Sequence, residues 1–267
     1  MSVGTIIIGL ILAGIGALLA TVLRAKLSSK AVEVQYMKTS KIGDLKQTFG
    51  DMSGLSDSFR QYVELQGISA SANAPKTPYS QQEVAYYSAE LIQVYERDEY
   101  YKDSEGNQKL RTVRAEDTVS SEKSNENVLL KDAETGETVS LDPQDASSGF
   151  ELVEGYNRFE PQTNMGSFGF FRTFTPRNLG NRTLGYRMVE KIIPLGKPLY
   201  VLGDAFQRAG TIYVSHPEDS KKPFVVSTKS EGQIVAEAKT GATFALVGGI
   251  VLAVGGLAVT VMGFFPG

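Results

Sequence analysis

Residues 3–23 read VGTIIIGLILAGIGALLATVL and contain no charged side chain. An α-helix rises about 1.5 Å per residue, so this stretch would be roughly 31 Å long, close to the ~30 Å core of a bilayer. Positive charges follow the apolar run instead of preceding it, and the run is longer than the apolar part of a signal peptide. The stretch therefore predicts a transmembrane helix and argues against a cleaved signal.

A second uncharged run, residues 242–265, predicts another span. Ser230 and Gln233 form a capping-box pattern, so we expect a helix over 231–265 that runs into it. Basic residues flank the inner ends of both spans: Arg24, Lys26, Lys30, Lys38, Lys41, Lys229 and Lys239. By the positive-inside rule we expect the intervening residues on the cytoplasmic side of a multi-pass protein. A bacterial inner membrane, a thylakoid-type membrane and an organelle envelope all fit this pattern.

Both runs carry small residues at four-residue spacing: Gly9, Ala13 and Ala17 in the first, and Gly241, Ala245, Gly249 and Ala253 in the second. Such spacing lets helix backbones approach closely. The two spans could pair antiparallel, or copies of the chain could form a homo-oligomer. Gly and Ala are also common in membrane helices generally, so the sequence leaves these interpretations open.

Composition excludes several classes of function. All 27 Lys and Arg and all 30 Asp and Glu lie between Arg24 and Lys239, with no basic excess, so we expect no nucleic-acid partner. The chain has no Cys and one His, which excludes disulfides, thiolate nucleophiles and Cys/His zinc sites. We expect no metal and no cofactor.

Residues 28–60 predict a juxtamembrane helical segment. Apolar residues recur at helical spacing, and two glycines at 50 and 54 interrupt the stripe: Ile42, Leu45, Phe49, Met52, Leu55 and Phe59. We interpret the segment as a helical hairpin whose apolar face packs on the soluble domain or lies at the lipid surface.

Residues 62–229 predict one β-rich soluble domain, because short runs of β-branched and aromatic residues alternate with turn residues. The expected strands are 62–69, 83–100, 110–117, 128–131, 138–141, 186–194, 198–204, 210–215 and 224–227. Hairpins are expected around Glu134–Glu137 and Leu195–Lys197. The fold class is thus a membrane protein with two transmembrane helices flanking a mainly β, small barrel-like domain.

Two segments stand apart from this pattern. Residues 101–127 are polar and predict a mobile excursion. Residues 157–181 carry Phe159, Phe168, Phe170, Phe171 and Phe174. We interpret them as a loop held to the core by its rings, with a partner or lipid contact as the alternative.

The motifs of known chemistry do not occur in this sequence. The glycines at 166 and 169 lack the lysine of a phosphate-binding loop, and His216 lies in a polar turn without a nucleophile motif. We interpret the clustered acidic residues as solvated strand ends: Asp98, Glu99, Asp103, Glu105, Glu116 and Asp117. Five tyrosines fit one long strand: Tyr86, Tyr87, Tyr95, Tyr100 and Tyr101. We expect no catalytic, cofactor-binding or metal-binding residues.

The order of these segments resembles the GIDE family, whose members are membrane-anchored RING-type ubiquitin ligases with a "beside a membrane" domain between two spans. The resemblance is carried by VELQG at 63–67, APKTPYSQQEVAYYSAELIQVYER at 74–97, VLLKDAETGETVSLDP at 128–143, GYNRFEP at 155–161, GYRMVEKIIPLGKPLYVLGDA at 185–205 and PFVVSTKS at 223–230. These patterns are diffuse and include no catalytic signature.

The resemblance implies a ligase whose zinc-binding RING follows the second span, whereas this sequence ends at Gly267 and has no Cys. It resembles a bacterial or plastid-type member lacking the RING, which we expect to have no enzymatic activity alone. Two functions follow as expectations. One is a membrane-anchored scaffold with a protein partner at the lipid bilayer. The other is a substrate-capturing or membrane-targeting component of a ubiquitin-ligase-like system in which a separate chain supplies catalysis.

Overall fold

The computed structural model describes residues 3–51, 59–142, 149–162 and 182–264. The chain forms two compact units where one domain was expected. The first combines Met1–Ile68, Leu130–Glu151 and Pro198–Gly267, and the second combines Ser69–Leu129 and Leu152–Lys197. The helical anchor and a β-barrel belong to the first unit, and the second unit is a separate sheet.

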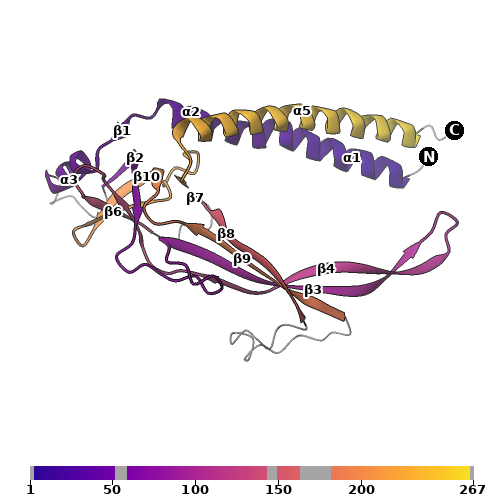
Figure 1. Ribbon diagram of the computed structural model, residues 1–267. Coiled ribbons are helices and arrows are strands. Elements are labelled where there is room, and N and C mark those ends of the chain that lie inside the picture. Colours follow the sequence, from indigo (N-terminus) through magenta and orange to yellow (C-terminus); the bar gives the residue numbers. More distant parts are fainter. Residues whose placement is uncertain (1–2, 52–58, 143–148, 163–181, 265–267) are drawn as a thin grey trace. The chain divides into compact units, whose positions relative to one another are not determined.

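Two long apolar helices lie at the two ends of the chain, before and after the strands in sequence, and they run side by side (Figure 1). The first consists of α1 (Val3–Leu18), a π-helical turn η1 (Leu19–Leu23) and α2 (Arg24–Tyr36). The second is α5 (Glu231–Phe264). Each is 34 residues long and apolar enough to cross a membrane. α5 covers residues 231–264 of the helix expected over 231–265. Its reciprocal cap is present, because Ser230 N donates to Gln233 Oε1 at 3.0 Å and Gln233 N donates to Ser230 Oγ at 3.4 Å.

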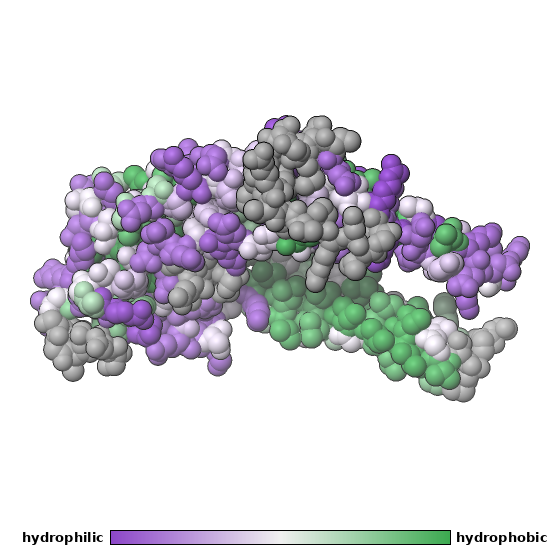
Figure 2. Space-filling model, turned by 90° about the horizontal axis from the view of Figure 1, so that it is seen from below, coloured by the Kyte–Doolittle hydropathy of each residue, from purple (hydrophilic) through white to green (hydrophobic). Residues whose placement is uncertain are grey.

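The two long helices pack antiparallel through small residues. A Cβ built on Gly9 would lie 2.6 Å from the Gly256 carbonyl oxygen, and one on Gly16 would lie 2.5 Å from that of Gly249. The most apolar windows of the helices are only 11% and 17% buried, unlike the core helix of a soluble protein. Figure 2 shows the resulting continuous apolar surface in green. Antiparallel pairing, one of the interpretations left open, is therefore observed within the chain.

The juxtamembrane segment is not the expected helical hairpin. Helix α2 ends at Tyr36, β1 (Thr39–Ser40) pairs in parallel with a barrel strand, and α3 (Ile42–Asp51) follows. Ile42, Leu45 and Phe49 of the predicted stripe are buried on α3. Residues 52–58, with Met52 and Leu55, lie outside the described residues. The glycine at position 50 does not break the helix, because packing of the apolar stripe outweighs its low propensity.

Five strands of the first unit close into a small barrel: β2 (Arg60–Ala70), β5 (Val128–Lys131), β6 (Thr138–Leu141), β11 (Thr211–Ser215) and β10 (Pro198–Arg208). Closure comes from antiparallel pairing of β2 with β10, from Arg60 opposite Phe206 to Ile68 opposite Pro198. β12 (Val225–Ser227) and β7 (Phe150–Glu151) extend the sheet beyond β10. The barrel predicted from strand spacing is thus confirmed, with β1 and β7 as additional strands.

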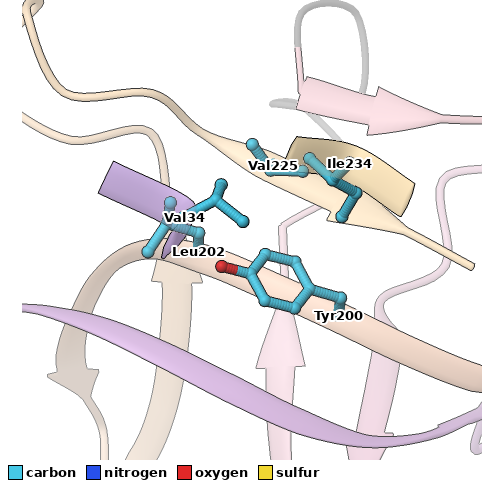
Figure 3. Close-up of a cluster of buried hydrophobic side chains, with 5 residues drawn as sticks. All are labelled: Val34, Tyr200, Leu202, Val225 and Ile234. Atoms are coloured by element: carbon cyan, nitrogen blue, oxygen red, sulfur yellow. The ribbon is translucent and has the colours of Figure 1, made fainter. Parts of the chain in front are cut away.

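The helical anchor is joined to this barrel by a shared hydrophobic cluster. Val34 of α2 and Ile234 of α5 pack with Tyr200, Leu202 and Val225 of the sheet (Figure 3). All five side chains are at most 3% exposed. Burying such side chains contributes roughly 1.5–3 kcal/mol each. The anchor and the barrel are therefore one packed body.

The second unit is a four-stranded antiparallel sheet in the order β4-β3-β9-β8. Its strands are β3 (Tyr86–Lys102), β4 (Gln108–Lys123), β8 (Val153–Pro161) and β9 (Arg182–Ile193). The core contains Leu91, Tyr186 and Met188. The expected mobile excursion over 101–127 is wrong for its greater part, since β4 pairs with β3 from Gln108 to Lys123.

The far end of the β3–β4 hairpin extends beyond the rest of its sheet. Among the described residues, β9 begins at Arg182, opposite Glu96, so from Arg97 to Lys102 strand β3 has described pairings with β4 alone. Tyr100 and Leu110 face each other on this ribbon and are 69% and 54% exposed. The loop expected over 157–181 is wrong at its start, because Phe159 lies in strand β8. Phe168, Phe170, Phe171 and Phe174 lie outside the described residues.

Candidate functional site

The acidic residues considered at the sequence level have structural partners. Asp103 forms an ion pair with Lys109, Glu99 with Arg111 and Glu116 with Arg187, while Asp98 accepts from Thr112 and Asp117 from Tyr95. His216 is exposed, and its ring lies 5.1 Å from that of Phe224. Among the described residues no group of three or more His, Asp or Glu side chains is placed to hold a metal ion. These residues do not form a shared site.

The five tyrosines of β3 divide by position along the strand. Tyr86, Tyr87 and Tyr95 are buried, whereas Tyr100 and Tyr101 lie on the exposed ribbon. Burial raises the pKa of Tyr87, and the hydrogen bond from its hydroxyl to Glu122 raises it further. The Tyr87 and Tyr95 hydroxyls donate across the sheet to Glu122 and Asp117 of β4, and all five tyrosines lie on one long strand, as expected.

A fully buried carboxylate organises the second unit. Glu190 of β9 accepts hydrogen bonds from Tyr79 N at 2.6 Å, Ser80 N at 3.1 Å and the Ser80 hydroxyl at 2.5 Å. Burial, with the charges of Glu122, Glu190 and Glu90, raises the pKa of Tyr79 to about 12. Glu190 therefore fixes the loop at 77–82 by accepting its backbone donors.

A second buried carboxylate lies on the outer face of the barrel. Glu64 is 0% exposed and accepts hydrogen bonds from the hydroxyls of Thr39 at 2.6 Å and Tyr200 at 3.0 Å, and from the Gln66 amide at 3.3 Å. Burial, followed by the charge of Glu64, raises the pKa of Tyr200 above its ordinary range. Tyr200 therefore remains a hydrogen-bond donor, and the network holds β1, β2 and β10 together.

A groove of about 460 Å³ opens beside this network. Its walls are Gln66–Gly67 of β2, Pro198–Tyr200 of β10 and residues 228–233, which lead into α5. β12 pairs with β10 only over Tyr200–Leu202, and the chain then turns away to begin α5. The lining mixes amides, hydroxyls and both signs of charge, which suits a protein segment better than an apolar small molecule. We take this groove as the candidate binding site.

Ionic contacts join Lys229, which lines the groove, to Glu151, and Glu151 in turn to helix α2. Glu151 of β7 contacts Lys30 Nζ at 2.7 Å and Lys229 Nζ at 3.6 Å, and Lys229 also pairs with Glu237 of α5 at 2.5 Å. Burial alone would raise the pKa of Glu151, but the hydrogen bond and charge of Lys30, with help from Ser227 and Lys229, hold it below its usual value. Lys229 of the groove wall is thus held by carboxylates of β7 and α5.

Sequence reasoning did not find this groove or either buried carboxylate. Glu64 lies in VELQG and Glu190 in GYRMVEKII, so both fall within the stretches that carry the family resemblance. For Glu64 the available signal was its place between apolar Val63 and Leu65 on a strand, whereas Glu190 is followed by Lys191 and gave no such signal. The groove gave no local signal, because its walls come from three distant parts of the chain.

These features define a class of protein: a β-barrel joined to an antiparallel pair of apolar helices, with a polar groove at the junction. The family model GIDE, described as E3 Ubiquitin ligase, matches residues 96–263. This match covers more than half of the chain, so the chain belongs to the GIDE family. Comparisons with curated proteins and with solved structures each found no match.

Proposed function

We propose that this chain is a membrane-anchored, partner-binding member of the E3-ligase-related GIDE family. The groove at the barrel–anchor junction carries the proposal, because it is open, polar and built on elements that are packed together. In this account α1 and α5 span the membrane, and the barrel presents the groove at its cytoplasmic surface. The chain binds a protein partner and has no catalytic activity alone.

Site-specific photocrosslinking in native membranes tests the proposed groove. Gly232 suits a photoreactive residue, because a Cβ there meets nothing within 4 Å and Gly232 lines the groove. Thr228 supplies a second probe and exposed Lys221 of the same unit a control position. We expect one reproducible protein adduct from positions 228 and 232 and none from position 221. Equal adducts at all three positions would contradict a specific groove.

A second candidate function is favoured by the family match itself. The family is described as E3 Ubiquitin ligase, so a separate chain with a RING could supply catalysis while this chain captures substrate. Mass spectrometry of the adducts from Gly232 tests this version. A RING-bearing protein or its substrates among the adducts would favour it, and adducts that contain neither would favour a scaffold.

A further inference from the structure

A second groove lies where α2 and α5 leave their charge-free stretches. It has a volume of about 300 Å³. Arg24 and Ser28 line it on α2, and Lys239 and Thr243 line it on α5, together with apolar side chains that include Leu246. Arg24 is the first charge after the run from Val3, and Lys239 is the last charge before the second run.

The charges of this groove have one sign. Its lining includes two cations and no carboxylate. Lys239 Nζ donates to the neutral Gln35 Oε1 at 2.8 Å, and within the described part of the chain neither Arg24 nor Lys239 forms an ion pair. Lys30 and Lys229, by contrast, are both paired with Glu151. Among the described residues, these two cations therefore have no carboxylate partner.

We infer that this groove binds the phosphate of an anionic phospholipid. Arg and Lys side chains between helices at the membrane boundary attract anionic headgroups. The Ser28 hydroxyl adds a hydrogen-bond donor, whereas the Thr243 hydroxyl already donates to the Lys239 carbonyl oxygen at 3.0 Å. Leu246 lies within the charge-free run and continues the groove toward the apolar surface of the helices. A headgroup held by the cations would thus leave its acyl chains beside an apolar surface. The inference rests on the proposed membrane insertion.

The test uses the full chain reconstituted in phosphatidylcholine nanodiscs with increasing phosphatidylglycerol, and native mass spectrometry counts the lipids retained. We expect retention of one phosphatidylglycerol molecule. The double variant Arg24→Gln/Lys239→Gln should weaken retention on the order of tenfold or more, since each cation near the surface contributes on the order of 1 kcal/mol.

The matched control is Lys26→Gln/Lys38→Gln, which removes the same charge from exposed positions outside the groove. Neither lysine lines the groove, so we expect this control to retain the lipid within about twofold of the unsubstituted chain. Equal weakening by both double variants would overturn the site, because the attraction would then be diffuse. If inorganic phosphate saturated the groove and phosphatidylglycerol bound no more tightly than phosphate, the assignment to a lipid would be overturned.

The nanodisc experiment separates loss of the lipid site from loss of the proposed membrane anchor. A chain that enters nanodiscs but shows no preference for phosphatidylglycerol overturns the lipid site alone. A chain that does not enter nanodiscs of either composition overturns both the membrane anchor and the lipid site.

Discussion

Gly16 of α1 and Gly249 of α5 lie in backbone contact: a Cβ on Gly16 would be 2.5 Å from the Gly249 carbonyl oxygen. The same close approach recurs at Gly9 and Gly256. Only residues without a side chain permit two helices to meet in this way. The pair therefore depends on glycine at these positions.

We expect Gly16→Leu to separate the helices. The new side chain would meet the backbone of α5 and not a flexible side chain, so overpacking should cost about 1–3 kcal/mol. Thermal unfolding in detergent should show a fall of several degrees. Gly14→Leu is the matched control, because a Cβ at Gly14 meets nothing within 4 Å. An equal fall for both variants would show that the glycine contact is not what stabilises the pair.

The Glu64 network predicts a specific pattern of coupling. Glu64→Ala leaves the buried Tyr200 hydroxyl without its acceptor, so we expect a loss of about 2–4 kcal/mol in the free energy of unfolding. Tyr200→Phe alone should cost about 1 kcal/mol. In the Glu64→Ala background, Tyr200→Phe should lower the free energy of unfolding by less than it does alone, or should raise it. Additive losses in a double-mutant cycle would argue against the hydrogen bond.

The ion pairs of Glu151 predict that the protein loses stability in acid. Because the pKa of Glu151 is held below its unfolded value of 4.5, its contribution is present above that value and is lost as pH falls through the folded pKa. Unfolding measured between about pH 6 and pH 3 should show this loss. In the Lys30→Gln variant, the acid-dependent fall in the free energy of unfolding should be smaller. An unchanged pH profile in that variant would remove Lys30 as the cause.

The β3–β4 ribbon should open more readily than the sheet from which it extends. An isolated pair of strands is marginally stable in water. Amides from Arg97 to Lys102, which pair with β4 alone among the described residues, should therefore exchange hydrogen faster than those from Glu90 to Val94, which pair on both sides. Hydrogen exchange with mass spectrometry resolves the two segments. Equal protection would indicate that a further surface covers the ribbon.

The sequence predicted the elements that depend on local pattern. Ile42, Leu45 and Phe49 recur at helical spacing and are buried on α3, and Gly136, at φ +75°, marks the turn between β5 and β6. The strands expected at 83–100 and 110–117 overlap β3 and β4, but the extension of β4 to Lys123 was missed. Most side chains of the ribbon are exposed, so they do not alternate between apolar and polar. Glu99 pairs with Arg111, and Asp98 with Thr112, in place of an apolar face.

The candidate site depended on contacts that local pattern does not encode. β2 and β10 close the barrel although Glu64 and Leu202 are far apart in sequence. β1 and β7 have two residues each, which is too short for a periodic signal. The groove follows from these long-range pairings, so it could be located only in three dimensions.

The central claim is that the helix pair spans a membrane with the barrel on its cytoplasmic side. The chain has no cysteine, so single cysteines at Gly4 and Lys221 can be compared directly. A Cβ at Gly4 meets nothing within 4 Å, and Lys221 is exposed. With a membrane-impermeant thiol reagent on intact spheroplasts of an expression host, we predict labelling of Gly4→Cys, and labelling of Lys221→Cys only after permeabilisation. Equal labelling of both positions before permeabilisation would contradict spanning, and labelling of Lys221→Cys alone would contradict the orientation.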